Sequence, residues 1–456
     1  MKKTLLALSI AGLLTACGGS DGTNTSTGSD NTDSSSFKVI DGYLSGAEVC
    51  VIAEGADICT KIGETDENGS IDIPAGTTGQ LVATIIAGKT LDADSVGFVD
   101  TTYQMLADIK VSTHNVITPY TTLDALDPDK SIADIAAELG LNVDVINGDY
   151  VASTSEEKET VHAIARVLAS KLNESKDENE PATLLTHASD VKAYIDDNEI
   201  TDLSNAHFSI DSNNVVTHSI SNPILNTFIA NNLYVEDDPD SNLFHLYNLN
   251  EIRNESENFG VGFTSGTNIS IYNIDSHEKI DAEFTTEGNI INLSIDDEIV
   301  SDEFIYVGDS LALVVTSSDS DLITYVDSDV DDRDIVWSKD YFIENTFYYI
   351  FDDSDSDTPK PAIIDITFAE DGTAIMHDQG PEENITWEVD GLYLTLYFDA
   401  NDPDDSITIL KYVAEGDITL FAEKAEPGYK PSSYGLMSTN QTLAKQIFNR
   451  WNTLAN

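Results

Sequence analysis

The chain has 456 residues, and its charge is one-sided, with 82 Asp and Glu against 22 Lys and Arg and a formal net charge of -60 at pH 7. This balance excludes a nucleic-acid-binding protein, which needs a basic surface to neutralise phosphates, and a helix that docks on anionic lipid. Apolar residues make up 41% of the chain, with 16 Phe, 18 Tyr and 3 Trp, which argues against wholesale disorder. The length has room for about two to four domains.

The first residues have the pattern of an export signal. Two lysines precede the apolar run Leu5–Leu14, which is too short to cross a bilayer. The sequence Leu14-Thr15-Ala16-Cys17 resembles a bacterial lipobox. The resemblance implies that residues 1–16 are a signal peptide and that Cys17 is acylated, for example with palmitate, and becomes the N-terminus. The alternative is an ordinary signal peptide with an incidental cysteine.

The segment after the signal predicts where the protein is held. Gly18 and Gly19 follow Cys17, which resembles the outer-membrane sorting pattern of such lipoproteins. We therefore expect a lipid anchor in the outer membrane, on the periplasmic or the cell-surface face, since a triacylated cysteine holds a protein stably. Residues 17–36 are mostly Gly, Ser, Thr, Asp and Asn and predict a flexible tether. No other stretch has 18 apolar residues, so we expect no membrane-spanning helix.

Short alternating runs of apolar and polar residues occupy residues 37–119, and turn pairs such as Asp41-Gly42 and Asn68-Gly69 separate them. This pattern predicts a small antiparallel β-sandwich. Cys50 and Cys59 lie nine residues apart in a chain expected to be exported, which favours a disulfide. A metal or redox pair, the alternative, would need closer spacing or histidine partners.

Two motifs in this region resemble a known family. The run VIDGYLSGAEVC over Val39–Cys50, followed by TDENG over Thr65–Gly69, resembles the carboxypeptidase-regulatory-like domains of Gram-negative surface lipoproteins. The resemblance implies a sandwich architecture and continues through Ile117–Leu123 into a set of small helices. Members often have an Asp- and Asn-rich loop between the cysteines that suits a cation. Here that loop is shorter, and its acids are Glu54 and Asp57.

Residues 120–200 predict a helical packing unit. Ser131 can cap a helix with Asp134 at the third position, and Gly140 can end that helix.

A second helix is expected from Thr154, with Glu157 as its capping-box partner, and a short helix around Asp190–Ile195. His162 and Arg166 lie just off the apolar stripe of the second helix. We expect this pair to form a solvated edge and no site.

The second half of the chain is rich in β patterns and looks duplicated, with β-meander domains expected over 222–325 and 337–425. Two pairs of similar segments indicate the duplication. They are Phe228–Tyr234 with Phe342–Tyr348, and Ile280–Gly288 with Ile364–Gly372.

A two-residue turn at Asp390-Gly391 joins Ile385–Val389 to Leu392–Phe398 and predicts a hairpin. The pattern F-x-x-D-G-T followed by W-x-V-x-x-x-x-L-x-L resembles lipocalin-like β units. The resemblance implies barrel-like domains, whose interior is either a core filled by side chains or an apolar cavity for a ligand.

Residues 439–454 predict a C-terminal helix, because Leu443, Ile447, Trp451 and Leu454 recur on one helical face. We expect this helix to dock on the body of the protein, and recognition of a partner is the alternative.

The sequence carries no catalytic signature: it has no Gly-x-Ser-x-Gly, no His-Glu-x-x-His and no phosphate-binding Gly-x-x-x-x-Gly-Lys. Its eight histidines are scattered without metal-ligand spacing, so we expect no enzyme. Acidic runs offer hard oxygen ligands at alternating positions, which suits calcium. We expect these runs to be solvated hairpin tips that keep β-edges apart, and we expect no cofactor, with ordered calcium as the alternative. The candidate calcium residues are Asp327, Asp329, Asp331, Asp353, Asp355 and Asp357.

These observations predict a mainly β, multidomain α+β protein with an N-terminal β-sandwich, a small helical unit, two antiparallel β-meander or barrel-like domains and a C-terminal helix. As its function we expect a non-enzymatic binding or adhesion module that meets a glycan or protein surface and no nucleic acid. One alternative is capture of a small apolar or glycan ligand by a lipocalin-like barrel. The other is a hydrolase of envelope or extracellular polymer, which two carboxylates facing each other in a cleft, one with a raised pKa, would favour.

Overall fold

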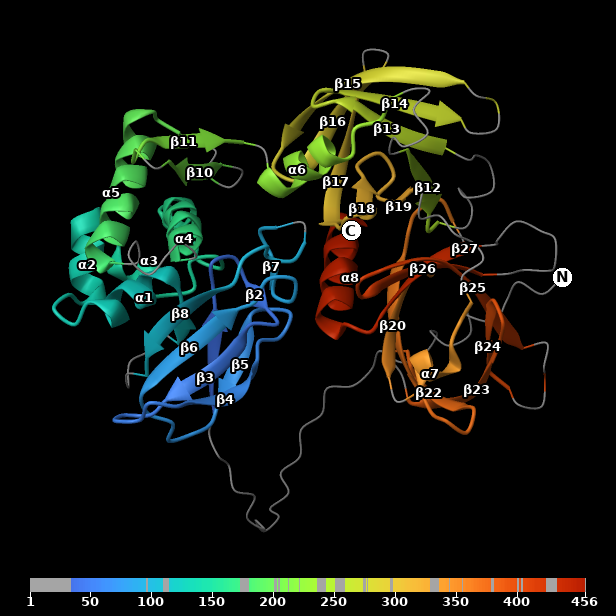
Figure 1. Cartoon of the computed structure of the whole chain (residues 1–456), viewed down its shortest axis with the longest axis horizontal. Coiled ribbons are helices and arrows are strands. Elements are labelled where there is room, and N and C mark those ends of the chain that lie inside the picture. The colour runs from blue at the N-terminus through green and yellow to red at the C-terminus, as the bar shows by residue number, and fades with distance from the viewer. Residues whose placement is uncertain are drawn as a thin grey trace, which may run out of the picture.

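The protein is mainly β and multidomain, as the sequence predicts (Figure 1). The computed structural model describes residues 34–455, apart from the side chain of Tyr412 and residues 96, 110–114, 173–179, 201–202, 204–205, 212, 221, 236–242, 251–258, 274–275, 277, 296–297, 329–335, 344, 355, 379–380, 400–401, 403–404 and 424–432. Cys17 lies outside the described residues. Within them, no helix combines the length and the apolar composition that crossing a membrane requires.

The N-terminal part is a β-sandwich. One sheet has the strand order β5-β1-β9, the other has the order β4-β3-β6-β8, and β2 pairs with β7 in a separate ribbon. Strand β1 begins at Ser35, inside the segment expected to be tether, and it buries Phe37 and Val39 on alternate positions. The strands are β1 (Ser35–Val39), β2 (Leu44–Ser45), β3 (Glu48–Ile52), β4 (Cys59–Glu64), β5 (Ser70–Ile73), β6 (Gln80–Ile85), β7 (Leu91–Asp92), β8 (Tyr103–Asp108) and β9 (Val116–Ile117).

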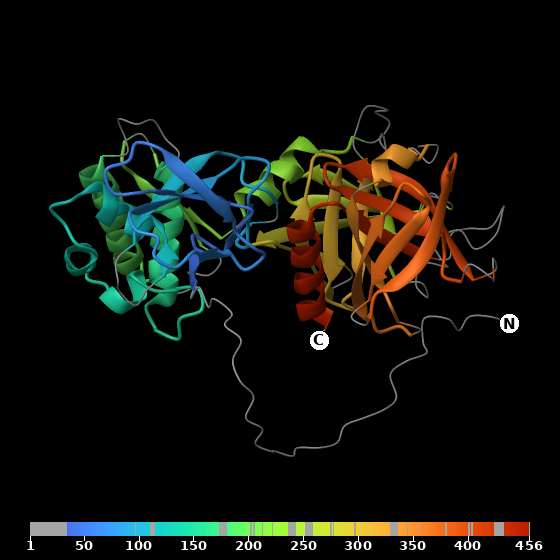
Figure 2. The same cartoon turned by 90° about the horizontal axis from the view of Figure 1, so that it is seen from below.

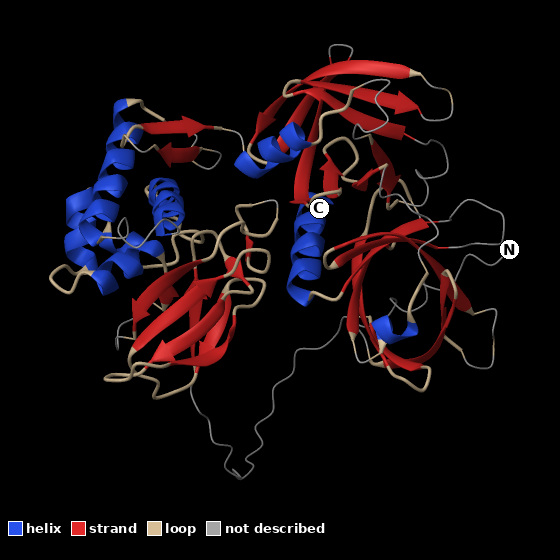
Figure 3. Ribbon diagram, in the orientation of Figure 1, coloured by secondary structure: helices blue, strands red, loops and turns tan. Residues whose placement is uncertain are grey.

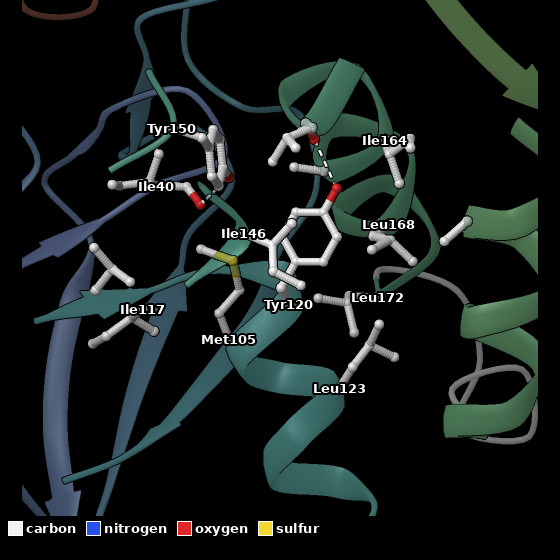
Figure 4. Packing of buried hydrophobic residues seen from close by; sticks show 14 of the residues in the cluster. Ile40, Met105, Ile117, Tyr120, Leu123, Ile146, Tyr150, Ile164, Leu168 and Leu172 are labelled. Atoms are coloured by element: carbon white, nitrogen blue, oxygen red, sulfur yellow. Dashed lines mark hydrogen bonds between the residues drawn. The ribbon is translucent and has the colours of Figure 1, made fainter. Parts of the chain in front are cut away.

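A helical unit follows and shares one hydrophobic core with the sandwich. Tyr150 joins the two parts, because its buried hydroxyl donates to the carbonyl of Ile40 in the sandwich at 2.9 Å (Figure 4). Within the helical unit, the buried Tyr120 donates its hydroxyl to the carbonyl of Val161 at 2.7 Å. The sandwich and the helices therefore pack as one N-terminal unit. Its further elements are α1 (Pro119–Leu126), α2 (Ile132–Leu139), α3 (Val143–Ile146), α4 (Lys158–Leu172), α5 (Pro181–Asp197), β10 (His207–Ile210) and β11 (Val216–Ser219).

The helix signals in the sequence have mixed outcomes. The capping box of Ser131 and Asp134 is confirmed, and Gly140 ends α2 in the left-handed conformation. The expected start at Thr154 is wrong, because α4 begins at Lys158 and the carboxylate of Glu157 accepts from the backbone N–H of Asn142 at 2.9 Å. The short helix expected around residues 190–195 is part of the longer α5, since apolar residues continue its buried face toward the N-terminus.

The second half contains two closed eight-stranded barrels with the same up-and-down strand order (Figures 1 and 3). Barrel 1 has β12 (Phe244–Asn248), β13 (Phe259–Ser265), β14 (Asn268–Asn273), β15 (Lys279–Glu287), β16 (Ile290–Ile295), β17 (Glu298–Val307), β18 (Leu311–Thr316) and β19 (Leu322–Asp327). Barrel 2 has β20 (Thr346–Asp352), β21 (Pro361–Phe368), β22 (Thr373–His377), β23 (Glu383–Asp390), β24 (Tyr393–Tyr397), β25 (Ser406–Glu415), β26 (Ile418–Glu423) and β27 (Ser433–Ser438). Strand β27 extends barrel 2 beyond residue 425, because closure requires it to pair with both β26 and β20.

A short helix precedes each barrel and packs an aromatic side chain into its interior. Helix α6 (Pro223–Asn231) contributes Phe228 to barrel 1, and α7 (Lys339–Phe342) contributes Phe342 to barrel 2. After each helix, one residue forms an isolated parallel bridge to the second strand of its barrel: Leu233 to Phe263 and Ile343 to Phe368. The first pair of similar segments therefore begins at equivalent aromatic residues, Phe228 and Phe342. It does not match beyond them, because the bridging residue is the fifth after Phe228 and the first after Phe342.

The second pair of similar segments does not lie at equivalent positions in the two barrels. Ile280–Gly288 covers β15, the fourth strand of barrel 1, whereas Ile364–Gly372 covers β21, the second strand of barrel 2. The fourth strands correspond through Phe284 and Trp387, whose backbone N–H groups donate to the turn after the second strand in each barrel. Alternating strands share one local pattern, so similarity between two of them does not establish equivalent places in a barrel.

The predicted hairpin in barrel 2 is confirmed, with a shift in its turn. Asp390 pairs with Tyr393, so the two loop residues are Gly391 and Leu392. Gly391 has a φ of 61°, which glycine adopts without strain.

Helix α8 (Gln441–Ala455) lies between the N-terminal unit and the barrels, as Figure 2 shows from below. Its apolar face belongs to a cluster that contains residues of both barrels, and Trp451 is fully buried there and donates to the carbonyl of Ser320 at 2.9 Å. On the other side, Gln446 donates to the hydroxyl of Ser45 at 2.6 Å. The C-terminal helix therefore docks on the body of the protein.

Candidate functional site

Three basic side chains follow one face of α4 at intervals of four residues: Lys158, His162 and Arg166. Side chains four residues apart lie above one another on a helix, about 6 Å apart along its axis. The apolar face of α4 packs into the shared core of the N-terminal unit. The face with the basic side chains can therefore contact polar groups of the sandwich.

A pocket of about 210 Å³ lies against this face of α4. Its volume is well above the ~10–15 Å³ that holds one water molecule and below the ~300–1,000 Å³ of pockets for drug-sized ligands. The pocket can therefore take a small molecule. It is lined by Asp94, Tyr150, Val151, Lys158, Glu159, His162, Arg166 and Leu203.

The centre of the site is a close contact between a carboxylate of the sandwich and an imidazole of the helix. Asp94, in the loop after β7, places a carboxylate oxygen 2.6 Å from Nε2 of His162, and their side chains are only 22% and 17% exposed. Burial acts to raise the pKa of Asp94, but His162 and the charge of Arg166 together hold this pKa below its usual value. Asp94 is thus a carboxylate at neutral pH.

Arg166 completes the basic side of the pocket, and a second histidine, His207, lies within reach of its charge. Nη2 of Arg166 donates to the carbonyl of Leu203 at 2.8 Å, which orients the guanidinium beside the pocket. Burial, followed by the charge of Arg166, lowers the pKa of His207 to about 4. His207 is therefore uncharged at neutral pH and does not compete with Arg166 for a negative group.

Two more carboxyl groups lie next to Asp94 but do not line the pocket. Asp41 is 5% exposed and accepts from the hydroxyl of Tyr103 at 3.3 Å, and Asp92 accepts from the backbone N–H of Asp94 at 3.0 Å. Burial raises the pKa of Asp92 to about 7, and the charge of Asp94 adds to the rise. Burial also raises the pKa of Asp41 well above its usual value, with the charges of Asp92 and Asp94 adding to it.

Only glycine fits at position 42 in this arrangement. A Cβ atom there would lie 2.3 Å from Oδ1 of Asp92 and 2.9 Å from Cγ of Asp94. The Asp41-Gly42 pair is thus more than a turn signal, because Gly42 makes room for the two carboxyl groups. This role of Gly42 cannot be recognised from the sequence, since Asp-Gly pairs are common in turns.

The prediction that His162 and Arg166 form a solvated edge is wrong. Both are partly buried against the loop that carries Asp94, and both line the pocket. The four-residue spacing from Lys158 through His162 to Arg166 is the signal that could have indicated a site. Its partners, Asp94 and Leu203, lie far away in the chain and follow no motif.

Of the other predicted site residues, the cysteines are confirmed as a disulfide, with the Cα atoms of Cys50 and Cys59 5.5 Å apart. The disulfide joins β3 to β4 in the sandwich, away from the pocket residues. Cys17, the predicted lipidation site, stays a prediction.

The candidate calcium residues lie in separate places. Asp327 is the buried last residue of β19, whereas Asp353 and Asp357 lie in the loop after β20, where Asp353 forms an ion pair with Lys360. In the part of the chain that the structure describes, no three His, Cys, Asp or Glu side chains converge as a metal ion would require. Calcium binding stays a prediction, and three of its residues lie outside the described part: Asp329, Asp331 and Asp355.

Aromatic side chains fill the interiors of both barrels. In barrel 1, the ring of Phe228 lies 5.3 Å from that of Phe244 and 6.1 Å from that of Phe263, measured between centroids. In barrel 2, the ring of Phe342 lies 5.1 Å from that of Phe368 and 5.7 Å from that of Trp387. These are ordinary packing distances for aromatic pairs, and they are typical of a core.

Comparisons with known proteins identify no family. No protein family and no curated protein matches the chain. One solved structure is similar, that of a protein of unknown function from the DUF3598 family of Nostoc punctiforme, with 9% sequence identity over 46% of this chain and 96% of that chain. Its TM-score is 0.20, which is too low to support an argument about this protein.

Proposed function

We propose that this protein is a lipoprotein of the outer membrane, anchored through Cys17, that acts as a non-enzymatic binding module with the polar pocket beside α4 as its ligand site. The observation that carries the proposal is the convergence of Lys158, His162 and Arg166 with Asp94 around one small pocket. Burying charged groups costs free energy, so a partly buried set of both signs around open space favours a site.

The anchor is supported by the sequence and by one feature of the fold. The lysines, the apolar run and the lipobox-like end at Cys17 together predict export and acylation. The disulfide between Cys50 and Cys59 suits an oxidising compartment outside the cytoplasm. The expected tether would hold the N-terminal unit and its pocket away from the membrane surface.

Capture of an apolar ligand inside a barrel has less support. The interior positions near α6 and α7 are occupied by the packed rings of Phe228 and Phe342 with their neighbours. A ligand would have to displace these rings and forfeit their packing. The pocket beside α4 needs no such displacement, and for this reason we place the ligand site there.

Ligand screening of the full chain in detergent tests the proposed function. Unfolding temperatures are measured with a panel of small polar compounds, including sugars, organic acids, amino acids and nucleosides. We expect at least one class to raise the unfolding temperature of the native chain, because a ligand that binds only the folded state stabilises it. The His162→Gln variant should lose this response. No response in the whole panel, or an undiminished response in the variant, would contradict the proposal.

The anchor is tested separately on intact cells. An alkyne analogue of palmitate should label the native chain and leave a Cys17→Ser variant unlabelled. Protease added to the cells then separates the two faces of the membrane, since only a protein on the cell surface is degraded. An undegraded band would count against adhesion and leave a periplasmic binding role.

A hydrolase is the second candidate, and one observation favours it. Asp92 and Asp94 are neighbouring carboxyl groups whose pKa values shift in opposite directions, Asp92 upward through burial and Asp94 downward through His162 and Arg166. Only Asp94 lines the pocket, so Asp92 is not placed to give its proton to a substrate there. Hydrolysis of chromogenic glycosides or esters that is lost in Asp94→Asn would establish this function instead.

A further inference from the structure

The pocket beside α4 has opposite charges on its lining. Lys158 and Arg166 carry positive charge, and Asp94 and Glu159 carry negative charge. The whole chain has 82 acidic against 22 basic residues. The pocket lining, with two positive and two negative side chains, is therefore much less acidic than the chain as a whole. A pocket of this kind suits a ligand that itself carries both signs.

The cationic groups are placed to hold a carboxylate. Lys158 and Arg166 lie two helical turns apart on the same face of α4, about 12 Å along the axis, and their long side chains can converge on a group between them. Lys158 is half-buried and has no ion pair among the described residues. A carboxylate held by such charged donors makes short, strong hydrogen bonds.

The remaining walls limit the size and character of the ligand. Val151 and Leu203 offer apolar surface, and the Tyr150 hydroxyl is occupied by the carbonyl of Ile40. The ring of Tyr150 lies 5.5 Å from that of His162 and forms another wall. At about 210 Å³ the pocket has room for a small molecule with a short carbon chain.

We propose that the pocket binds a free α-amino acid with a small side chain. In this assignment Lys158 and Arg166 hold the carboxylate, Asp94 and Glu159 face the ammonium group, and Val151 with Leu203 contacts the side chain. The assignment rests on the proposed function, since it names the ligand class of the same site.

Calorimetry on the full chain in detergent tests this assignment with three compounds of matched skeleton. Alanine carries both charges, propionate lacks the ammonium group and ethylamine lacks the carboxylate. We expect alanine to bind and each of the other two to bind at least about tenfold more weakly, because propionate lacks the group that Asp94 and Glu159 would face and ethylamine lacks the group that Lys158 would hold. Glycine and valine probe the room for the side chain.

Variants locate the binding. Lys158→Gln should weaken alanine binding about tenfold through loss of a charged donor. Lys192→Gln is the matched control, because it removes the same charge from an exposed pair with Asp196 on α5, outside the pocket lining, and should leave the affinity unchanged. Lys158 is the first residue of α4 and only partly buried, so its replacement is compatible with folding.

The outcomes separate this inference from the proposed function. Equal binding of propionate or ethylamine, or unchanged affinity in Lys158→Gln, overturns the amino-acid assignment. No detectable binding of glycine, alanine and valine also overturns it, and the proposed function then stands only if another class in the ligand panel stabilises the chain. If no compound in the whole panel stabilises the chain, both the amino-acid assignment and the proposed function are overturned.

Discussion

The N-terminal unit and the two barrels bury different kinds of side chain. In the N-terminal unit, one hydrophobic core joins sandwich and helices, and beside it lie carboxyl groups of Asp41, Asp92 and Asp94 with the cations of α4. In the barrels, aromatic rings in tilted and edge-to-face contact pack in the interior. Aromatic packing stabilises a fold, whereas burial of charged groups costs free energy. The contrast therefore supports a functional site in the N-terminal unit and a structural role for the barrel interiors.

Barrel 1 also has buried carboxyl groups, those of Asp302, Asp321 and Asp327. Asp302 on β17 accepts from the hydroxyl of Tyr325 at 3.5 Å. These three groups do not line the pocket beside α4, whereas Asp94 of the N-terminal unit lies there together with basic side chains. We therefore regard the N-terminal unit as the functional region and the barrels as its scaffold, and four predictions test this division.

The largest effect is expected in the core of barrel 2. Phe342 is fully buried against Phe347, Phe368 and Trp387, so Phe342→Ala should lower the free energy of unfolding by about 3–5 kcal/mol. Denaturant unfolding followed by tryptophan fluorescence measures the loss. Ile375→Ala, at an exposed position of the same barrel, is the control and should cost well under half as much. Equal losses in the two variants would show that α7 does not hold the barrel core.

The disulfide should stabilise the N-terminal unit alone. Replacing Cys50 and Cys59 together by Ala should cost about 2–3 kcal/mol, because the crosslink limits the unfolded chain over a short loop. Hydrogen exchange read by segment should place the loss in the sandwich strands β3 and β4 and leave barrel amides protected as before. Loss of protection throughout the barrels would contradict the separation of the two regions.

Asp92 should make the N-terminal unit less stable as pH rises. Its folded-state pKa of about 7 lies above the ordinary value of Asp, so between about pH 4 and 7 the folded state keeps a proton that the unfolded state has lost. Stability falls through this window, and Asp92→Asn should remove that part of the fall and gain about 2 kcal/mol at pH 8 with little change at pH 4. Asn can still accept from the N–H of Asp94.

Urea unfolding at pH 4, 6 and 8 checks the sign. The exposed Asp100→Asn is the control and should change stability little at any of these pH values. A gain in Asp92→Asn that is equal at pH 4 and pH 8 would mean that the carboxyl group of Asp92 is not held in its protonated form.

The smallest effect is expected from Asp302 in barrel 1. Burial raises the pKa of Asp302 to about 6, although the hydroxyl of Tyr325 partly opposes this. Stability therefore falls between about pH 4 and 6, and Asp302→Asn should gain about 1–2 kcal/mol at pH 8. The variant should leave ligand binding in the N-terminal unit unchanged. Loss of stability at pH 8 would instead assign Asp302 a structural role as a carboxylate.

Several parts of the fold could be predicted because their signals are local. The capping box of Ser131 with Asp134 and the glycine after α2 act within one helix, and the apolar face of α8 follows from its own spacing. The alternation in β23 and β24 predicts their hairpin to within one residue at the turn. The start of α4 could not be predicted, because Glu157 is engaged by Asn142 and not by the expected cap.

The candidate site was predictable only in fragments. His162 and Arg166 were recognisable as a pair on one helix, but local spacing cannot show whether a helix edge meets solvent or another part of the chain. Asp94 comes from a loop of the sandwich more than sixty residues before them, and it decides that the edge is buried.

The sequence by itself determined the mainly β, multidomain class, the helical face of α8 and the pairing of Cys50 with Cys59, because each depends on residue patterns that repeat over short distances. Only the tertiary structure decided the strand correspondence between the barrels and the pocket beside α4. Strands with the same two-residue alternation have similar sequences, and only their pairing in the closed barrel shows which strands are equivalent. The pocket exists because one hydrophobic core packs α4 against the sandwich and brings Asp94 within 2.6 Å of His162.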